Sequence, residues 1–154
     1  IIDFVRSFSK GFIFTTSIMP SVAAAATKSI NIVKNADEDR ALIMEHASYL
    51  RSKLSANKIP FINSDSHIVP VMAFDSGLAK TYSKVLNEDF GIYIQPIFYP
   101  TVPKGEARLR ITITPKHSAD DIDALVRALS LVIKKSDSEQ NAVDVLPEFS
   151  GSYL

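Results

Sequence analysis

The sequence of 154 residues contains no cysteine, only three histidines, and no excess of charge of either sign. Without cysteine, the chain has no disulfide framework, no thiolate nucleophile and no cysteine-ligated zinc site. The histidines, His46, His67 and His117, are scattered along the chain, so we expect no metal site and interpret all three as structural. The balance of 17 basic and 17 acidic residues argues against nucleic acid as a partner.

Several functional signatures are also missing. No apolar run approaches the roughly 20 residues that span a bilayer, so we expect no membrane partner. The sequence has no glycine-rich phosphate loop and no Ser/His/Asp arrangement. Hydrophobic residues make up 46% and charged residues 22%, which is ordinary for a globular domain. The chain begins Ile-Ile-Asp rather than with Met, and we interpret it as part of a longer protein.

Hydrophobic periodicity predicts a chain of alternating helices and strands. Apolar residues at helical spacing and the positions of proline and glycine indicate helices. Runs of β-branched and aromatic residues indicate strands, among which Pro70 favours an edge position. Asp75 is expected to cap a helix that Gly91 ends, and Ser118 with Asp121 resembles a capping box. The predicted helices cover residues 1–9, 21–35, about 40–56, 76–90 and 119–135, and the predicted strands cover 12–14, 68–74, 92–95 and 108–114.

This order of elements predicts a two-layer α+β domain with helices packed on an antiparallel sheet. The link between the last two strands is too short for a parallel crossover. The run Phe12-Ile13-Phe14 predicts a strand buried on both faces, as in a larger sheet. The polar stretch 136–141 is expected to end the last helix before a tail without clear periodicity.

The candidate binding residues are arginines and hydroxyl residues. Arg108 and Arg110 alternate with apolar residues on the strand 108–114, and a guanidinium on a strand suits a carboxylate ligand. Thr101 lies between prolines in a stiff turn, and Thr15 and Thr16 follow an apolar run. Each candidate has an alternative interpretation. The arginines could be exposed without a ligand, Thr101 could be an ordinary turn residue, and the hydroxyls of Thr15 and Thr16 could bond the backbone.

Several blocks in order carry a resemblance to a known family. They are RSF (6–8), GFIFTTS (11–17) with Pro20, SHIVPV (66–71), GIYIQPI (91–97), YPTVPKG (99–105) and RLRIT (108–112). Together they resemble the C-terminal third of the 5-aminolevulinate synthases, which are pyridoxal-phosphate enzymes of the α-oxoamine synthase group. The resemblance covers residues 1 to about 135. It implies the small C-terminal domain of a fold-type I transferase, with a three- to four-stranded antiparallel sheet, plus a strand and short helix of the large domain.

The resemblance implies a role for each candidate residue. Arg110 matches the arginine that pairs with the carboxylate of glycine, and Thr101 matches the threonine that contacts the carboxylate of the succinyl group. Thr15 and Thr16 match residues that reach the cofactor phosphate of the neighbouring subunit, which implies a homodimer. Arg108 receives no such contact. The Schiff-base lysine is expected upstream of residue 1, so this chain alone holds no catalytic residue and is expected to be inactive.

The activity implied is the condensation of glycine with succinyl-CoA to 5-aminolevulinate, the entry step of haem synthesis. The implied organisation is the end of the large domain at 1–20, the small domain at 21–135 and a tail at 136–154. Bacterial cytoplasm is the expected compartment, with the mitochondrial matrix as the alternative. Two further alternatives are a sibling enzyme (2-amino-3-ketobutyrate CoA ligase or 8-amino-7-oxononanoate synthase) and a non-catalytic stand-alone domain.

Overall fold

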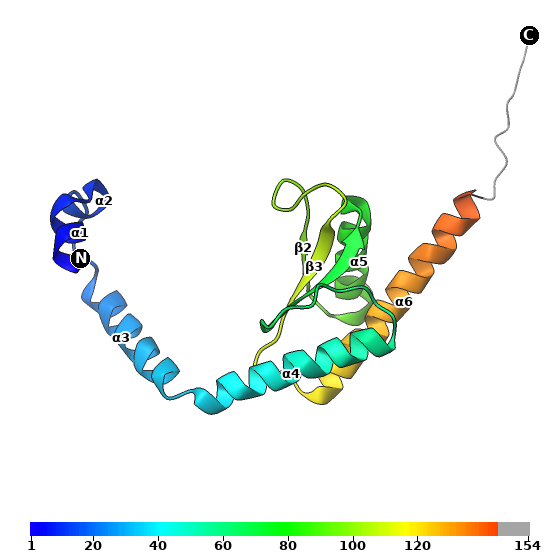
Figure 1. Ribbon diagram of the computed structural model, residues 1–154, viewed down its shortest axis with the longest axis horizontal. Coiled ribbons are helices and arrows are strands. Elements are labelled where there is room, and N and C mark those ends of the chain that lie inside the picture. Colours follow the sequence, from blue (N-terminus) through cyan, green and yellow to red (C-terminus); the bar gives the residue numbers. More distant parts are fainter. Residues whose placement is uncertain (145–154) are drawn as a thin grey trace, which may run out of the picture. The chain divides into compact units, whose positions relative to one another are not determined.

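The computed structural model of the protein describes the backbone of residues 1–144 and the side chains of residues 1–136 and 138 (Figure 1). Its described part divides into two compact units, Ile1–Asp37 and a second that begins at Glu38. The predicted tail at 136–154 therefore lies largely outside the described residues.

The first unit is made of three helices, α1 (Ile2–Phe8), α2 (Lys10–Ile13) and α3 (Pro20–Lys34). The expected helices at both ends of this region are confirmed, and Pro20 occupies the first turn of α3, where its missing N–H does no harm. None of the residues in these helices is buried within the unit. The rings of Phe4 and Phe8 stack with their centroids 4.8 Å apart.

The prediction of a buried strand at residues 12–14 is wrong for this structure. The backbone N–H groups of Phe12 and Ile13 both donate to the carbonyl of Ser9, at 2.9 and 3.0 Å, in a short helical turn. Phe14 follows the turn and is 83% exposed. A strand needs a neighbouring strand for its hydrogen bonds, and the first unit contains none, so the segment satisfies its backbone locally.

The second unit holds a sheet in the order β1-β3-β2, and both pairings are antiparallel, as predicted. Its strands are β1 (Ile68–Phe74), β2 (Gln95–Ile97) and β3 (Ala107–Thr112). Pro70 lies on the edge strand β1, in agreement with its missing N–H, and its carbonyl accepts a bond from Ile62 at 2.9 Å.

The last two strands are shifted from their predicted ranges. β2 begins at Gln95 rather than at Ile92, because the N–H of Ile92 donates to Leu86 in the cap of the preceding helix. β3 ends at Thr112 rather than at Thr114, because the N–H of Thr114 donates to Nδ1 of His117 at 3.1 Å. Capping and turn bonds thus compete with the ladder for the same backbone groups.

The helices of this unit are α4 (Asp37–Ala56), α5 (Ser76–Phe90) and α6 (Ala119–Asp144). Asp75 caps α5 as predicted, with its carboxylate accepting bonds from Gly77 and Leu78 at 2.7 and 3.0 Å. These bonds, first that from Leu78, lower the pKa of Asp75. Gly91 ends α5 in the left-handed conformation, with φ of 67°, as expected for a C-terminal glycine.

Helix α6 begins as predicted but runs further. Ser118 and Asp121 form the expected capping box, in which the N–H of Ser118 donates to Asp121 at 2.8 Å and the N–H of Asp121 donates to the Ser118 hydroxyl at 3.2 Å. The predicted end at residue 135 is wrong, because the helix continues to Asp144. The intervening residues are polar but include neither proline nor glycine, so nothing in them breaks helical hydrogen bonds.

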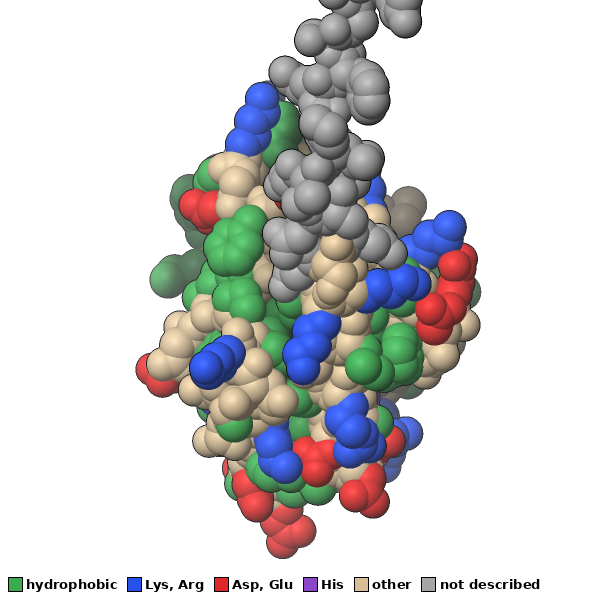
Figure 2. Space-filling view, turned by 90° about the vertical axis from the view of Figure 1, so that its right-hand side faces the viewer, with side chains coloured by type: hydrophobic (Ala, Val, Ile, Leu, Met, Phe, Trp, Pro, Cys, Tyr) green, Lys and Arg blue, Asp and Glu red, His purple; other side chains and the backbone are tan. Residues whose placement is uncertain are grey.

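The core lies between one face of the sheet and these helices, which confirms the two-layer α+β fold. Val69, Val71 and Leu109 of the sheet are fully buried in this core. The largest fully buried side chains of the helices belong to the same core cluster: Leu50 and Leu54 of α4, Leu86 of α5, and Ile122 and Leu129 of α6. On the face drawn in Figure 2, basic and acidic side chains are interspersed, as the balanced charge of the sequence suggests.

A polar contact also joins the helices. Asp123 of α6 accepts a hydrogen bond from the Tyr49 hydroxyl of α4 at 3.1 Å and pairs with Lys53 at 3.0 Å. The bond from Lys53 is the largest of the effects that lower the pKa of Asp123.

Candidate functional site

The open face of the sheet is centred on Arg110. Because side chains alternate along a strand, β3 sends Leu109 and Ile111 into the core and Arg108, Arg110 and Thr112 to the other face. Arg110 lies directly opposite Pro70 on one side and Gln95 on the other, so it stands in the middle of all three strands.

The two arginines of β3 differ in their partners. Arg108 donates from Nη2 to the carboxylate of Glu106 at 2.8 Å and from Nε to the Glu106 carbonyl at 2.9 Å. Its side chain is only 17% exposed. The side chain of Arg110 is exposed and makes no hydrogen bond or ion pair within the described part of the chain. The charge of Arg108 is thus met by Glu106, just before β3 begins, whereas Arg110 keeps its charge for a ligand.

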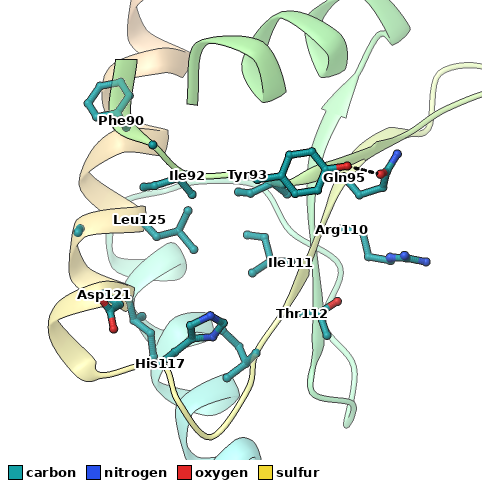
Figure 3. Close-up of a pocket in the computed structure, with 15 residues that line it drawn as sticks. Phe90, Ile92, Tyr93, Gln95, Arg110, Ile111, Thr112, His117, Asp121 and Leu125 are labelled. Atoms are coloured by element: carbon teal, nitrogen blue, oxygen red, sulfur yellow. Dashed lines mark hydrogen bonds between the residues drawn. The ribbon is translucent and has the colours of Figure 1, made fainter. Parts of the chain in front are cut away.

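A cleft of about 610 Å³ borders Arg110 at the start of β2, where the end of β3 has no strand beside it on that side (Figure 3). Apolar side chains line its core side, including Ile92 from the link between α5 and β2, Ile111 of β3 and Leu125 of α6. Its polar lining comprises Tyr93, Gln95, Arg110, Thr112, His117 and Asp121. In Figure 3, Arg110 and Gln95 project on the same side of the sheet, away from Ile111. The Arg110 guanidinium therefore points to the open face of the sheet rather than into this cleft, and a carboxylate ligand would meet it on that face.

Sequence reasoning did not single out Gln95 and Tyr93, which lie beside Arg110. The Tyr93 hydroxyl donates to Oε1 of Gln95 at 2.8 Å, and Nε2 of Gln95 donates to the carbonyl of Pro96 at 3.2 Å. Only the strand register reveals that Gln95 lies opposite Arg110.

His117 lies at the other end of this cleft and has a structural role. Its Nδ1 accepts the Thr114 N–H, and its own N–H donates to the Thr114 carbonyl at 3.2 Å. These bonds form the turn into α6. The neighbouring Asp121 has its pKa lowered, first by the N–H of Ser118 and then by the Ser118 hydroxyl.

Thr101 lies in the loop between β2 and β3. Its side chain is exposed, and its N–H donates to the Phe98 carbonyl at 3.0 Å, which closes a turn behind the cis Tyr99–Pro100 bond. Gly105, with φ of 83°, allows the loop to return to β3 in a conformation that other residues rarely adopt. The structure places Thr101 and Arg110 in the same unit but in different elements, a loop and a strand.

Thr15 and Thr16 belong to the first unit, which is described by itself. Both are exposed, and the Thr15 hydroxyl donates to the carbonyl of Phe12 at 2.8 Å. That bond matches the alternative in which the hydroxyl satisfies the backbone. The hydroxyl can rotate to another partner, so the phosphate contacts of Thr15 and Thr16 stay predictions.

Two absences concern the described residues alone. Within residues 1–144, no group of three or more His, Asp or Glu side chains is placed to hold a metal ion. Over the same range, no helix has both the length and the apolar character to cross a membrane.

Comparison with known proteins places the chain among relatives. It is 51% identical over 127 residues to the 5-aminolevulinate synthase of Rhizobium meliloti, a match that covers 82% of this chain and 31% of the relative. It is 40% identical over 134 residues to the mitochondrial 5-aminolevulinate synthase of Agaricus bisporus, with coverage of 87% and 22%. The resemblance inferred from the sequence is thereby confirmed. The chain spans about a third or less of the length of these relatives.

Solved structures share the fold. A serine palmitoyltransferase from S. paucimobilis, solved with a PLP–myriocin aldimine, matches with a TM-score of 0.79 and 29% identity over 88% of this chain and 34% of that chain. The 8-amino-7-oxononanoate synthase of Francisella tularensis has the same fold at 20% identity, with a TM-score of 0.73 over 88% of this chain and 39% of that chain. The family described as aminotransferase class I and II matches residues 1–129, most of the chain. The chain therefore belongs to the class I and II aminotransferase family.

Proposed function

We propose that this chain is the substrate-binding part of a longer pyridoxal-phosphate enzyme, a 5-aminolevulinate synthase that condenses glycine with succinyl-CoA and releases CO₂ and CoA. The observation that carries the proposal is the unpaired Arg110 at the centre of the open sheet face. The identity to the synthases of Rhizobium meliloti and Agaricus bisporus supports the choice of reaction.

Arg110 would bind the carboxylate of glycine. A guanidinium offers a planar pair of N–H donors that matches the two oxygens of a carboxylate, and a strand holds it more firmly than a loop does. Because Arg110 has no internal partner in the described chain, binding a carboxylate there breaks no existing ion pair.

Thr101 would contact the second carboxylate, that of the succinyl group. Its hydroxyl is exposed on a loop stiffened by Pro100 and Pro103, so a ligand meets a backbone that is already ordered. With Arg110 it would give the enzyme one contact for each of its two acidic substrates.

The described residues do not by themselves fit the cofactor. Pyridoxal phosphate supplies an electron sink to enzymes that bind it, but it needs a Schiff-base lysine, which the family resemblance places upstream of Ile1. Thr15 donates its hydroxyl proton to Phe12. Thr16 keeps an exposed hydroxyl that would suit a phosphate of the neighbouring subunit. We therefore propose that the cofactor binds the full-length homodimer and not this chain alone.

A chimaera tests the proposal directly. Residues 1–129 of this chain would replace the matching segment of the Rhizobium meliloti synthase, and the product would be assayed with glycine and succinyl-, acetyl- or pimeloyl-CoA. We expect 5-aminolevulinate formation with a clear preference for succinyl-CoA. As a matched control, the same junctions would receive the corresponding segment of the Rhodobacter capsulatus synthase, which is 44% identical to this chain.

An active control beside an inactive chimaera would contradict the proposed function. Preference for acetyl- or pimeloyl-CoA would instead assign the chain to a sibling α-oxoamine synthase. The relatives include bacterial proteins and proteins named as mitochondrial, so they do not favour one of the two expected compartments over the other.

A further inference from the structure

The two arginines on the open face of β3 have different neighbours across the sheet. Arg108 lies opposite the apolar residues Met72 and Ile97, and its charge is met by Glu106. Arg110 lies opposite Pro70 and Gln95. In this register, Gln95 is the polar side chain that faces Arg110 across the strands.

Gln95 is itself held in place. Tyr93 precedes it by two residues in an extended segment, so both side chains lie on the same side, and the Tyr93 hydroxyl reaches Oε1 of Gln95 at 2.8 Å (Figure 3). Nε2 of Gln95 also donates to the Pro96 carbonyl. Tyr93 is 72% exposed, and bonds so open to water add little to stability. Their effect is to restrict a long, flexible side chain.

We propose that Gln95, oriented by Tyr93, is a positioning residue for the carboxylate that Arg110 binds. The inference rests on the proposed function, in which that carboxylate belongs to glycine. Side chains directly opposite in an antiparallel pair have Cβ atoms about 5 Å apart, so the amide lies within reach of the guanidinium. In this structure the Gln95 amide bonds Tyr93 and Pro96 rather than Arg110, so it leaves the guanidinium charge uncompensated, and Nε2 has a second N–H that could donate to a carboxylate held by Arg110.

The charge of the residue at this position is what matters. A glutamate here would pair with Arg110 as Glu106 pairs with Arg108, and a substrate carboxylate would then have to displace it. The neutral amide avoids this competition. The sheet therefore keeps one arginine as a structural ion pair and leaves the next one available.

The test uses the full-length enzyme with Gln95→Glu, Gln95→Met and Tyr93→Phe. Glycine affinity would be measured by calorimetry without acyl donor, and KM and kcat by turnover. We expect Gln95→Glu to raise the Kd and KM for glycine about tenfold or more, because the new carboxylate would pair with Arg110 and compete with the substrate carboxylate for it. The kcat should change little. Gln95→Met and Tyr93→Phe should raise the Kd and KM for glycine by smaller factors.

The control is Asn87→Asp, the same amide-to-acid change at an exposed position of α5 that does not line the cleft. We expect it to leave glycine affinity unchanged. In a protein that already carries Arg110→Ala, adding Gln95→Glu should cause no further loss of glycine affinity, since the two residues act as a unit.

Three results would contradict these proposals, and they distinguish the proposed function from the positioning role. If Arg110→Ala alone leaves glycine binding unchanged, the proposed function fails. If Arg110→Ala weakens binding but the three substitutions at Gln95 and Tyr93 behave like Asn87→Asp, only the positioning role fails. An equal effect of Gln95→Glu with and without Arg110 would also overturn that role.

Discussion

Replacing Arg110 by alanine gives the sharpest prediction, because the structure separates its effect on binding from its effect on stability. Arg110 is exposed and has no internal partner in the described part of the protein, so its removal leaves no orphaned charge. Substitutions of this kind usually change the free energy of unfolding by less than about 0.5 kcal/mol. We therefore expect the thermal midpoint of the full-length enzyme to remain nearly unchanged.

Glycine binding should respond much more strongly. A hydrogen bond to a charged group contributes about 1.5–3 kcal/mol, and each 1.4 kcal/mol corresponds to a factor of ten. The KM and Kd for glycine should therefore rise about 10- to 100-fold. Arg110→Lys should recover only part of this loss, because an ammonium group keeps the charge but lacks the planar pair of donors.

The assay is initial-rate kinetics at saturating succinyl-CoA with glycine varied, together with calorimetric binding of glycine. Arg127→Ala is the matched control, since Arg127 is an exposed arginine on α6 that does not line the cleft. Unchanged glycine saturation in Arg110→Ala would refute the assignment of Arg110. Equal losses in Arg110→Ala and Arg127→Ala would show that only net charge matters.

Three further predictions concern stability. Leu109→Ala, at a fully buried site in the central strand, should lower the free energy of unfolding by about 2–5 kcal/mol in urea titrations followed by circular dichroism, and a loss below 1 kcal/mol would contradict the packing. Gly91→Ala should lower it by about 1 kcal/mol in the same assay, because φ is 67° and the position is otherwise open; a neutral result would argue against the left-handed cap. The pKa values of Asp75, Asp121 and Asp123 are lowered by folding, so their stabilisation is present above the unfolded pKa near 4 and is lost as pH falls through the folded values. Urea midpoints should therefore fall between pH 5 and pH 2, and the triple Asp→Asn variant should show a smaller fall than the parent.

The features predicted correctly from sequence are those whose cause is local. Asp75 and Gly91 act within one turn of their helix, and Ser118 bonds Asp121 three residues away. The strand expected at residues 12–14 depended on a partner strand, which the first unit does not provide. Polar composition suggested an end to α6 near residue 135, but polarity alone does not break a helix.

The same distinction applies to the site. Arg110 could be identified because alternation along one strand is visible in the sequence, whereas Gln95 could not, since its position opposite Arg110 depends on the register between two strands. The register in turn depends on where β2 begins, and that is decided by the bonds that Ile92 makes to the cap of α5.

Alternation along β3 also places stability and binding on opposite faces of the same strand. Leu109 and Ile111 are buried against the helices, while Arg110 between them faces the open side. A shift of register by one residue would bury the guanidinium and expose the leucine, at a cost that the core would not tolerate. The hydrophobic core therefore does more than stabilise the domain. It fixes the direction of Arg110, so a core variant that still folds should keep its affinity for glycine, and a variant of Arg110 should keep its stability.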